Sequence, residues 1–325
     1  MNKKKKLIFM LLHGVGFVLL YFVLKDLDWK LFWNLLNQFP VYKFLVGLIM
    51  LLAVYVLKSL RWFLINRSFE IDLPFAHTFV FYLVSGFLSV ITPGRLGELA
   101  KVFFIQKRNK ISYTQAFSSV ILDRIWDVMV LSMMAGISLV FLFSDFKLSI
   151  LGISVIAFFL AFSFGIIVYP GLLFKPLLLF TRRFSNLNSE IGKIYSLWSG
   201  KRIRFFIPSL FLSIGAFLIL SLIPLLFAEE INARVPFSAA ISAISISNIL
   251  SFIPVTIAGF GTREYVFVEI WKLFSHSKEV ALTLSAAQFF CTYLGSLFLG
   301  GAVYLIGFRK YFSRKEVENI KNIYQ

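Results

Sequence analysis

Long apolar runs separated by short charged segments make up most of this chain. The runs are Leu7–Leu24, Phe44–Leu64, Phe75–Thr92, Ala116–Phe143, Leu148–Phe174, Phe205–Ala228, Phe237–Phe274 and Val280–Phe308. A helix of about 20 apolar residues spans a hydrocarbon layer about 30 Å thick. The pattern therefore predicts an all-α integral membrane protein in which most of the runs are transmembrane helices.

Two of these runs contain charged glycine turns, and the two turns look like copies of each other. The first reads SVITPGRLGE, from Ser89 to Glu98, and the second reads SFIPVTIAGFGTRE, from Ser251 to Glu264. Each follows an apolar stretch of roughly 18 residues that opens with Pro-Phe, and from there the two stretches align without a gap. Duplicated breaks in hydrophobic helices indicate a transporter binding site at the interface of two repeats.

The arms that lead out of the two turns, Leu96–Gln106 and Glu264–Phe274, are too short to span a membrane. We therefore predict two re-entrant broken-helix hairpins beside about six full transmembrane helices. With both hairpins re-entrant, one side of the membrane holds 23 Lys and Arg residues and the other holds 7. Basic residues gather on the cytoplasmic side, so both termini are expected in the cytoplasm. The repeat units, at about 74–143 and 236–308, are then inverted.

Composition supports a single polytopic membrane domain over residues 1–325. Hydrophobic residues make up 59% and charged residues only 15%, which is too apolar for a soluble domain. The single cysteine, Cys291, excludes a disulfide framework within the chain. The net charge of +17 does not indicate nucleic acid as a partner, because the basic residues lie at the ends of apolar runs.

The segment 175–204 carries seven Lys and Arg residues and one acid, Glu190, among apolar residues. One interpretation is a surface helix that binds anionic membrane lipids. The other is an ordinary basic cytoplasmic loop. The sequence favours neither of the two.

The breaks and the span after them place charges at membrane depth, where each costs about 3 kcal/mol on translocon scales. We expect the charged groups to pair inside a polar cavity that binds a substrate. The candidate substrate-binding residues are Thr92, Pro93, Gly94, Arg95, Gly97, Glu98, Lys101, Asp123, Arg124, Asp127, Gly259, Gly261, Arg263 and Glu264. The alternative is that pairs such as Arg124 with Glu98 only hold helices together. Lys58 and Arg61, at the end of the second span, are expected to snorkel to the surface.

The free N–H groups at the start of Leu96–Gln106 favour an anion, and Arg95 stands beside them. Other chemistries lack their motifs. The chain has no Gly-rich phosphate loop, no metal-ligand spacing among its three His and one Cys, and no nucleophile elbow. We therefore expect no cofactor and no metal.

Three stretches carry a resemblance to a known family. They are TPGRLGELAKVFF from Thr92, LDRIWDVMVL at Leu122–Leu131 and IPVTIAGFGTREYVFVE at Ile253–Glu269. They resemble the transmembrane, flippase-like domain of lysylphosphatidylglycerol synthases, over nearly the whole chain. The resemblance implies an integral protein of the plasma membrane. It also implies a division of labour in the two-domain members of the family. Their membrane part moves an aminoacylated lipid between leaflets, and their soluble C-terminal domain makes that lipid. This chain of 325 residues is expected to lack the aminoacyl-transferase domain.

The leading hypothesis is a translocase for a phospholipid, glycolipid or polyprenyl lipid with a polar headgroup. The alternatives are a membrane-embedded transferase with Asp123 or Glu98 as base, a component of aminoacyl-phosphatidylglycerol synthesis, and a non-catalytic envelope scaffold. A cavity reached from each leaflet in turn favours transport, and a fully paired charge cluster without a cavity favours the scaffold. The sequence leaves open whether the protein forms a homo-oligomer.

Overall fold

The structure, a computed structural model, describes residues 18–92, 94–142, short pieces between 150 and 165, 185–198, 203–252 and 259–306. These parts are helical and contain no strand, which confirms the all-α class. The elements are α2 (Trp29–Leu36), α3 (Val41–Ser68), α4 (Phe75–Val90), η1 (Leu96–Leu99), α5 (Ala100–Asn109), α6 (Tyr113–Leu142), α9 (Ser185–Trp198), α10 (Ile203–Ala228), η3 (Glu229–Ile231), α11 (Phe237–Phe252), α12 (Thr262–Lys272), α13 (Lys278–Phe289), the π-helical turn η4 (Phe290–Leu294) and α14 (Gly295–Ile306).

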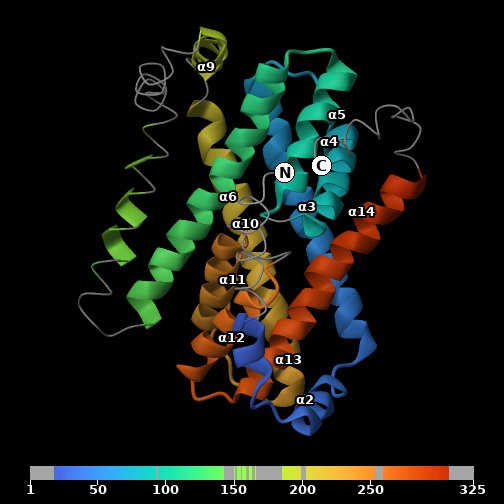
Figure 1. The fold of residues 1–325 in the computed structure, drawn as a ribbon, viewed down its shortest axis with the longest axis vertical. Helices are drawn as coiled ribbons and strands as arrows, with labels where there is room; N and C mark the ends of the chain where they lie inside the picture. The colour runs from blue at the N-terminus through green and yellow to red at the C-terminus, as the bar shows by residue number, and fades with distance from the viewer. Residues whose placement is uncertain are drawn as a thin grey trace, which may run out of the picture.

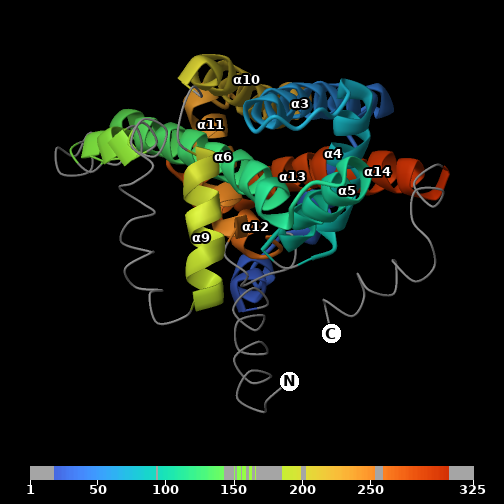
Figure 2. The same cartoon turned by 90° about the horizontal axis from the view of Figure 1, so that it is seen from above.

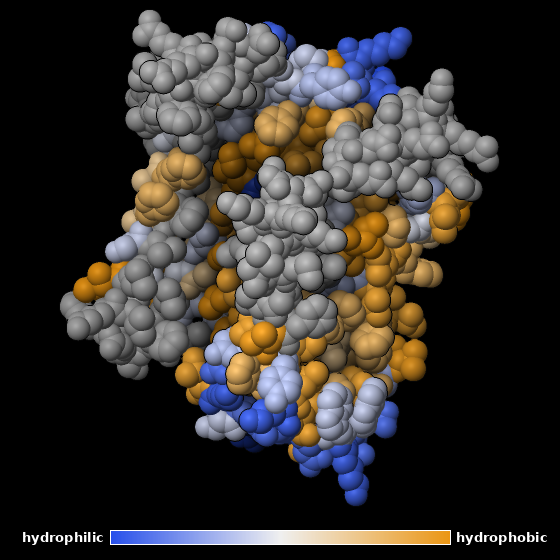
Figure 3. Space-filling view, in the orientation of Figure 1, coloured by the Kyte–Doolittle hydropathy of each residue, from blue (hydrophilic) through white to orange (hydrophobic). Residues whose placement is uncertain are grey.

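Three helical stretches are long and apolar enough to cross a membrane: Val41–Ser68, Ile207–Ile231 and Lys278–Ile306. Helix α6 has 30 residues and is about 45 Å long at 1.5 Å per residue, so it also has the length to span. Figure 3 shows a broad apolar zone across the middle of the visible face and hydrophilic residues at both ends of the long axis. This distribution is typical of a protein whose long axis crosses the bilayer.

Several predicted boundaries agree with the structure. Helices α4 and α11 begin at the predicted Phe75 and Phe237, and each has 16 residues. Helix α3 extends four residues past the predicted end of the second span, to Ser68. The run Leu148–Phe174 and the basic linker 175–204 lie largely outside the described residues, although α9 forms a helix within the linker.

The two predicted repeat units contain the same order of elements. In the first, the apolar helix α4 is followed by a glycine break, the short charged η1–α5 segment and the long helix α6. In the second, α11 is followed by a break, the short helix α12 and the long stretch α13–η4–α14. The packing crosses between the units, because α4 packs on α14 and α11 packs on α6. Figure 1 shows α4 and α5 in the upper half of the molecule and α11 and α12 in the lower half.

Helices α3 and α10 lie side by side and form a layer along one side of the molecule (Figure 2). Beneath this layer lie α4, α6, α11 and α13, and α3 or α10 contacts each of them. Small residues allow close approach at several of these contacts. A Cβ at Gly300 would stand 2.3 Å from the carbonyl oxygen of Leu83, so α14 lies directly against the backbone of α4.

Candidate functional site

The first break folds the chain tightly back against the end of α4. Gly94 and Arg95 both adopt the left-handed conformation, with φ of 59° and 57°. The Thr92 hydroxyl donates to the Leu88 carbonyl at 2.9 Å and accepts from the Gly97 N–H at 2.7 Å. A Cβ at Gly97 would stand 2.2 Å from the carbonyl carbon of Leu88. Thr92 and the two glycines therefore shape the turn that presents Arg95.

The second break also places an arginine at the start of a short helix, but different residues form the turn. Gly259 and Gly261 have φ of 74° and 86°, which favours glycine. The Glu264 carboxylate accepts the Gly261 N–H at 2.7 Å and so caps the first turn of α12. Arg263 pairs with Glu264, and its Nε donates to the Ser285 hydroxyl at 3.2 Å. An arginine thus stands beside each glycine break, next to a short helix that carries a glutamate.

Next to the first break lies a buried ion-pair network centred on Arg61 of α3. Its guanidinium has no exposed surface. Nε donates to the Asp123 carboxylate at 2.9 Å, and Nη1 donates to Asp127 at 2.7 Å and to the Ser213 hydroxyl at 2.9 Å. Asp123 and Asp127 lie four residues apart on one face of α6, as predicted. Arg61 therefore ties α3 to α6 and α10.

Lys101 and Arg124 add two further cations to the network. Lys101 Nζ lies 2.6 Å from a carboxylate oxygen of Asp123 and 3.5 Å from one of Glu98. Arg124 pairs with Glu98, and its Nη2 lies 2.9 Å from Asp127. The network joins the first break to α6. The predicted pair of Arg124 with Glu98 is present.

The expectation that Lys58 and Arg61 snorkel to the surface is wrong. Both are buried, with exposed fractions of 8% and 0%, and Lys58 Nζ lies 3.1 Å from Asp127. Because α3 continues to Ser68, both residues lie within the helix and well before its C-terminal end. Their spacing of three residues places them on one face of α3, but the same spacing is expected of side chains that snorkel, so the sequence offered no signal for their burial.

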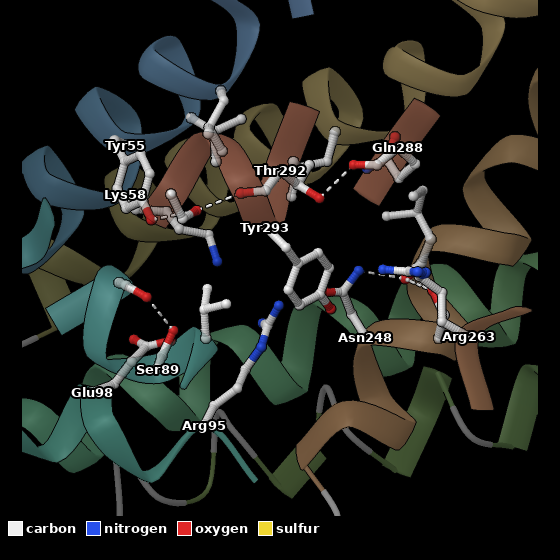
Figure 4. A pocket seen from close by; sticks show the side chains of 18 of the residues that line it. Tyr55, Lys58, Ser89, Arg95, Glu98, Asn248, Arg263, Gln288, Thr292 and Tyr293 are labelled. Atoms are coloured by element: carbon white, nitrogen blue, oxygen red, sulfur yellow. Dashed lines mark hydrogen bonds between the residues drawn. The ribbon is translucent and has the colours of Figure 1, made fainter. Parts of the chain in front are cut away.

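A polar cavity of about 90 Å³, enough for several water molecules, lies next to this network. Its charged lining residues are Lys58, Arg95, Glu98 and Arg263. Figure 4 shows Lys58 and Arg95 pointing into it from opposite sides. Its neutral polar lining includes Tyr55, Ser89, Ser247, Asn248, Gln288, Thr292, Tyr293 and Ser296. Residues from both repeat units and from α3 therefore share one cavity.

A second hollow, which we call the apolar groove, lies on the other side of Arg95. It has a volume of about 390 Å³. Its lining residues are Gly94, Arg95, Leu96, Leu99, Ile121, Arg124, Ile125, Val128, Met129, Phe162 and Phe252. The polar cavity and the apolar groove share Arg95.

The predicted site residues thus fall into several groups. Arg95, Glu98 and Arg263 line the cavity, while Lys101, Asp123 and Asp127 form the network behind it and Arg124 reaches the groove. Thr92, Gly94, Gly97, Gly259, Gly261 and Glu264 shape the two breaks. Pro93 lies outside the described residues.

Sequence reasoning missed the neutral polar lining of the cavity. Thr292 and Tyr293 lie in the π-helical turn η4, and π-turns occur frequently at functional sites. Asn248 and Gln288 are the amide residues of α11 and α13, in which the other polar residues beyond the first turn are Ser and Thr, and such isolated amides are a signal that the sequence does offer. Within the described ranges, no group of His, Cys, Asp and Glu side chains has the arrangement of a metal site.

Comparison with known proteins identifies the family. Residues 8–300 match the family described as lysylphosphatidylglycerol synthase TM region. The chain is also similar to a UPF0104 membrane protein of Methanocaldococcus jannaschii, with 25% identity over 296 residues that cover 84% of this chain and 86% of that protein. The family match covers far more than half of the chain. This membrane protein therefore belongs to the lysylphosphatidylglycerol synthase TM region family.

Proposed function

We propose that the protein moves a lipid with a polar headgroup between the leaflets of the plasma membrane. The observation that carries the proposal is the polar cavity, enclosed in a helical body whose middle is apolar on its outer face (Figure 3). A headgroup needs such a cavity because its passage through hydrocarbon is costly. The hydrocarbon chains stay among apolar surfaces throughout.

The duplicated elements support alternating access. We infer that each broken unit is a re-entrant hairpin and that the two enter from opposite sides, which makes the repeat inverted and leaves both termini in the cytoplasm. The crossed packing of α4 on α14 and of α11 on α6 suits such a pseudo-symmetric pair. In inverted-repeat transporters the substrate site lies near the midplane between the repeats, and one unit rocks against the other.

The pairing of the carboxylates counts against Asp123 as the base of a transferase. Asp123 already accepts from Arg61, Lys101 and Arg124, so its lone pairs are occupied. Glu98 is the one carboxylate among the described residues of the cavity lining, and it is held by Arg124 and Lys101. A general base needs a free lone pair within reach of its proton. Asp123 offers none, and both ion-pair contacts of Glu98 are to its Oε2, so a transferase would depend on Glu98 Oε1.

The test uses purified protein in vesicles that contain a fluorescent phosphatidylglycerol. A membrane-impermeant quencher measures how much label reaches the outer leaflet, and mass spectrometry then weighs the extracted lipid. We expect faster redistribution than in protein-free vesicles and no change in lipid mass. A new covalent product, or redistribution no faster than in empty vesicles across anionic, zwitterionic and aminoacylated lipids, overturns the proposal.

A matched pair of variants on α11 locates the activity. Ser247→Phe places a large side chain in the cavity lining, whereas Ser238→Phe places the same side chain in the first turn of the helix, away from the cavity. We expect Ser247→Phe to slow redistribution and Ser238→Phe to leave it unchanged. Unfolding of both purified variants is measured beside the assay, so that loss of fold is distinguished from a filled cavity.

A further inference from the structure

The cavity has a net positive charge. Its lining carries three cations, Lys58, Arg95 and Arg263, and one carboxylate, Glu98, which leaves two positive charges. Widening the count to the network behind it and to Glu264 gives six cations and four carboxylates, again an excess of two. Buried charges are stable only when they are paired. The excess therefore favours an anion in the cavity.

One of the two excess charges is that of Arg95. The other belongs to the network, in which four cations face three carboxylates, whereas Arg263 is paired with Glu264. Lys58 has Asp127 at 3.1 Å, but among the described residues no carboxylate forms an ion pair with Arg95. The Arg95 guanidinium lies 6.0 Å from the ring centroid of Tyr293, and that of Arg263 lies 5.2 Å from the same ring. Arg263 is 4% exposed, and its buried Nη1 has no hydrogen-bond partner.

Arg95 also marks the boundary between two environments. On one side lies the polar cavity, and on the other the apolar groove formed largely by α6 and η1. Apart from Arg95 and Arg124, the groove is lined by Gly94 and apolar side chains, so a molecule that contacts Arg95 and extends along the groove meets apolar surface. The arrangement matches a lipid, in which an anionic group is joined to a hydrocarbon chain.

We propose that the cavity and the groove bind one anionic lipid, with its phosphate held by Arg95 and Arg263 and one hydrocarbon chain in the apolar groove. This rests on the proposed translocation and adds the class of substrate. Guanidinium groups bind phosphate oxygens through paired, charge-assisted hydrogen bonds. A phosphodiester neutralises one of the two excess charges and a phosphomonoester neutralises both. A lipid with a net positive headgroup would leave the excess in place.

The charge selectivity is measured by equilibrium binding to the purified full-length protein in a neutral detergent. The probes are phosphatidate, phosphatidylglycerol, phosphatidylcholine and lysyl-phosphatidylglycerol with identical acyl chains. We expect the first two to bind more tightly than the last two. Arg95→Gln should weaken phosphatidylglycerol binding by about tenfold or more, whereas the exposed Arg108→Gln control should not. Equal affinity for all four probes, or equal effects of the two variants, overturns the proposal.

Two variants on α6 test whether a hydrocarbon chain of the lipid lies in the apolar groove. Val128→Trp fills the apolar groove, and Ile137→Trp puts the same side chain at a position that is 40% exposed on that helix. We expect Val128→Trp to weaken the binding of all four lipids to the same extent, so that the preference for anionic lipids is retained. If it behaves like Ile137→Trp, the chain does not lie in the groove and the proposal is wrong.

The outcome separates this inference from the proposed function. Selective binding of phosphatidylglycerol without movement between leaflets would leave the binding site standing and remove the translocase. Movement of all four lipids at the same rate, with Arg95→Gln as active as the native protein, would leave the translocase standing and remove the anionic substrate class.

Discussion

Replacement of Arg61 by methionine tests whether the buried network stabilises the fold. Methionine fills a similar volume but removes the guanidinium, which contacts Asp123 at 2.5 and 2.9 Å, Asp127 at 2.7 Å and the Ser213 hydroxyl at 2.9 Å. All of these contacts are fully buried. The variant therefore takes away hydrogen bonds between three helices without opening a large cavity.

The expected loss follows from the charges that remain. Without Arg61, the network keeps the three cations Lys58, Lys101 and Arg124 against the three carboxylates Glu98, Asp123 and Asp127, so it stays neutral. Breaking a buried pair costs about 3–5 kcal/mol of unfolding free energy, and we expect Arg61→Met at the lower end. Asp123→Asn instead leaves four cations with two carboxylates and is expected at the upper end, about 5 kcal/mol.

The free energy of unfolding is measured by denaturant titration of the purified variants in one detergent. The set includes the double variant that combines Arg61→Met with Asp123→Asn. The double variant should lose less than the sum of the two single losses, because the residues act on each other directly. Arg67→Met is the control on the same helix, since Arg67 pairs with Asp72 at 3.0 Å where both are exposed. We expect it to lose at most about 1 kcal/mol. Losses for Arg61→Met as small as that, or strict additivity, would refute the stabilising role.

Two further predictions concern the first break and the topology. Gly97→Ala places a Cβ 2.2 Å from the backbone of α4 and should prevent stable folding, whereas Gly192→Ala, with nothing within 4 Å, should be neutral or slightly stabilising in the same unfolding assay. Normal unfolding of Gly97→Ala would mean that the break is looser than described. A cysteine at position 232 should react with an impermeant maleimide outside intact cells, and cysteines at Asn2 and Gln325 should not. Labelling of either terminus would contradict the proposed orientation.

The helices were largely predictable because the bilayer imposes simple length and composition rules. The starts of α4 and α11 coincide with Pro-Phe, since a proline just before the first turn of a helix removes no hydrogen bond of that helix. The end of α3 was predicted too early, because Arg61 and Arg67 resemble the charged flank of a span. Periodicity cannot tell a snorkelling arginine from one that is buried against an aspartate far away in the sequence.

The site was predictable where it depends on local signals. The breaks, the two arginines beside them and the aspartates on α6 could be read from the order of Gly, Pro and charged residues. The part contributed by tertiary packing could not. Nothing in the sequence near Lys58 indicates that α3 lies against α6, and the π-helical turn that brings Tyr293 to the cavity has no clear local signature.

The charged groups at membrane depth therefore divide into two sets, which reconciles the two interpretations that the sequence left open. Arg61, Asp123 and Asp127 are fully buried and paired several times, as expected of groups that hold helices together. Arg95 and Arg263 line the cavity and keep unused binding capacity. Variants of the first set should lose stability, and activity with it. An Arg95 variant should lose lipid binding while unfolding as the native protein does, because among the described residues no carboxylate pairs with Arg95. An Arg263 variant should lose lipid binding and some stability as well, because Arg263 pairs with Glu264 and donates to Ser285 of α13.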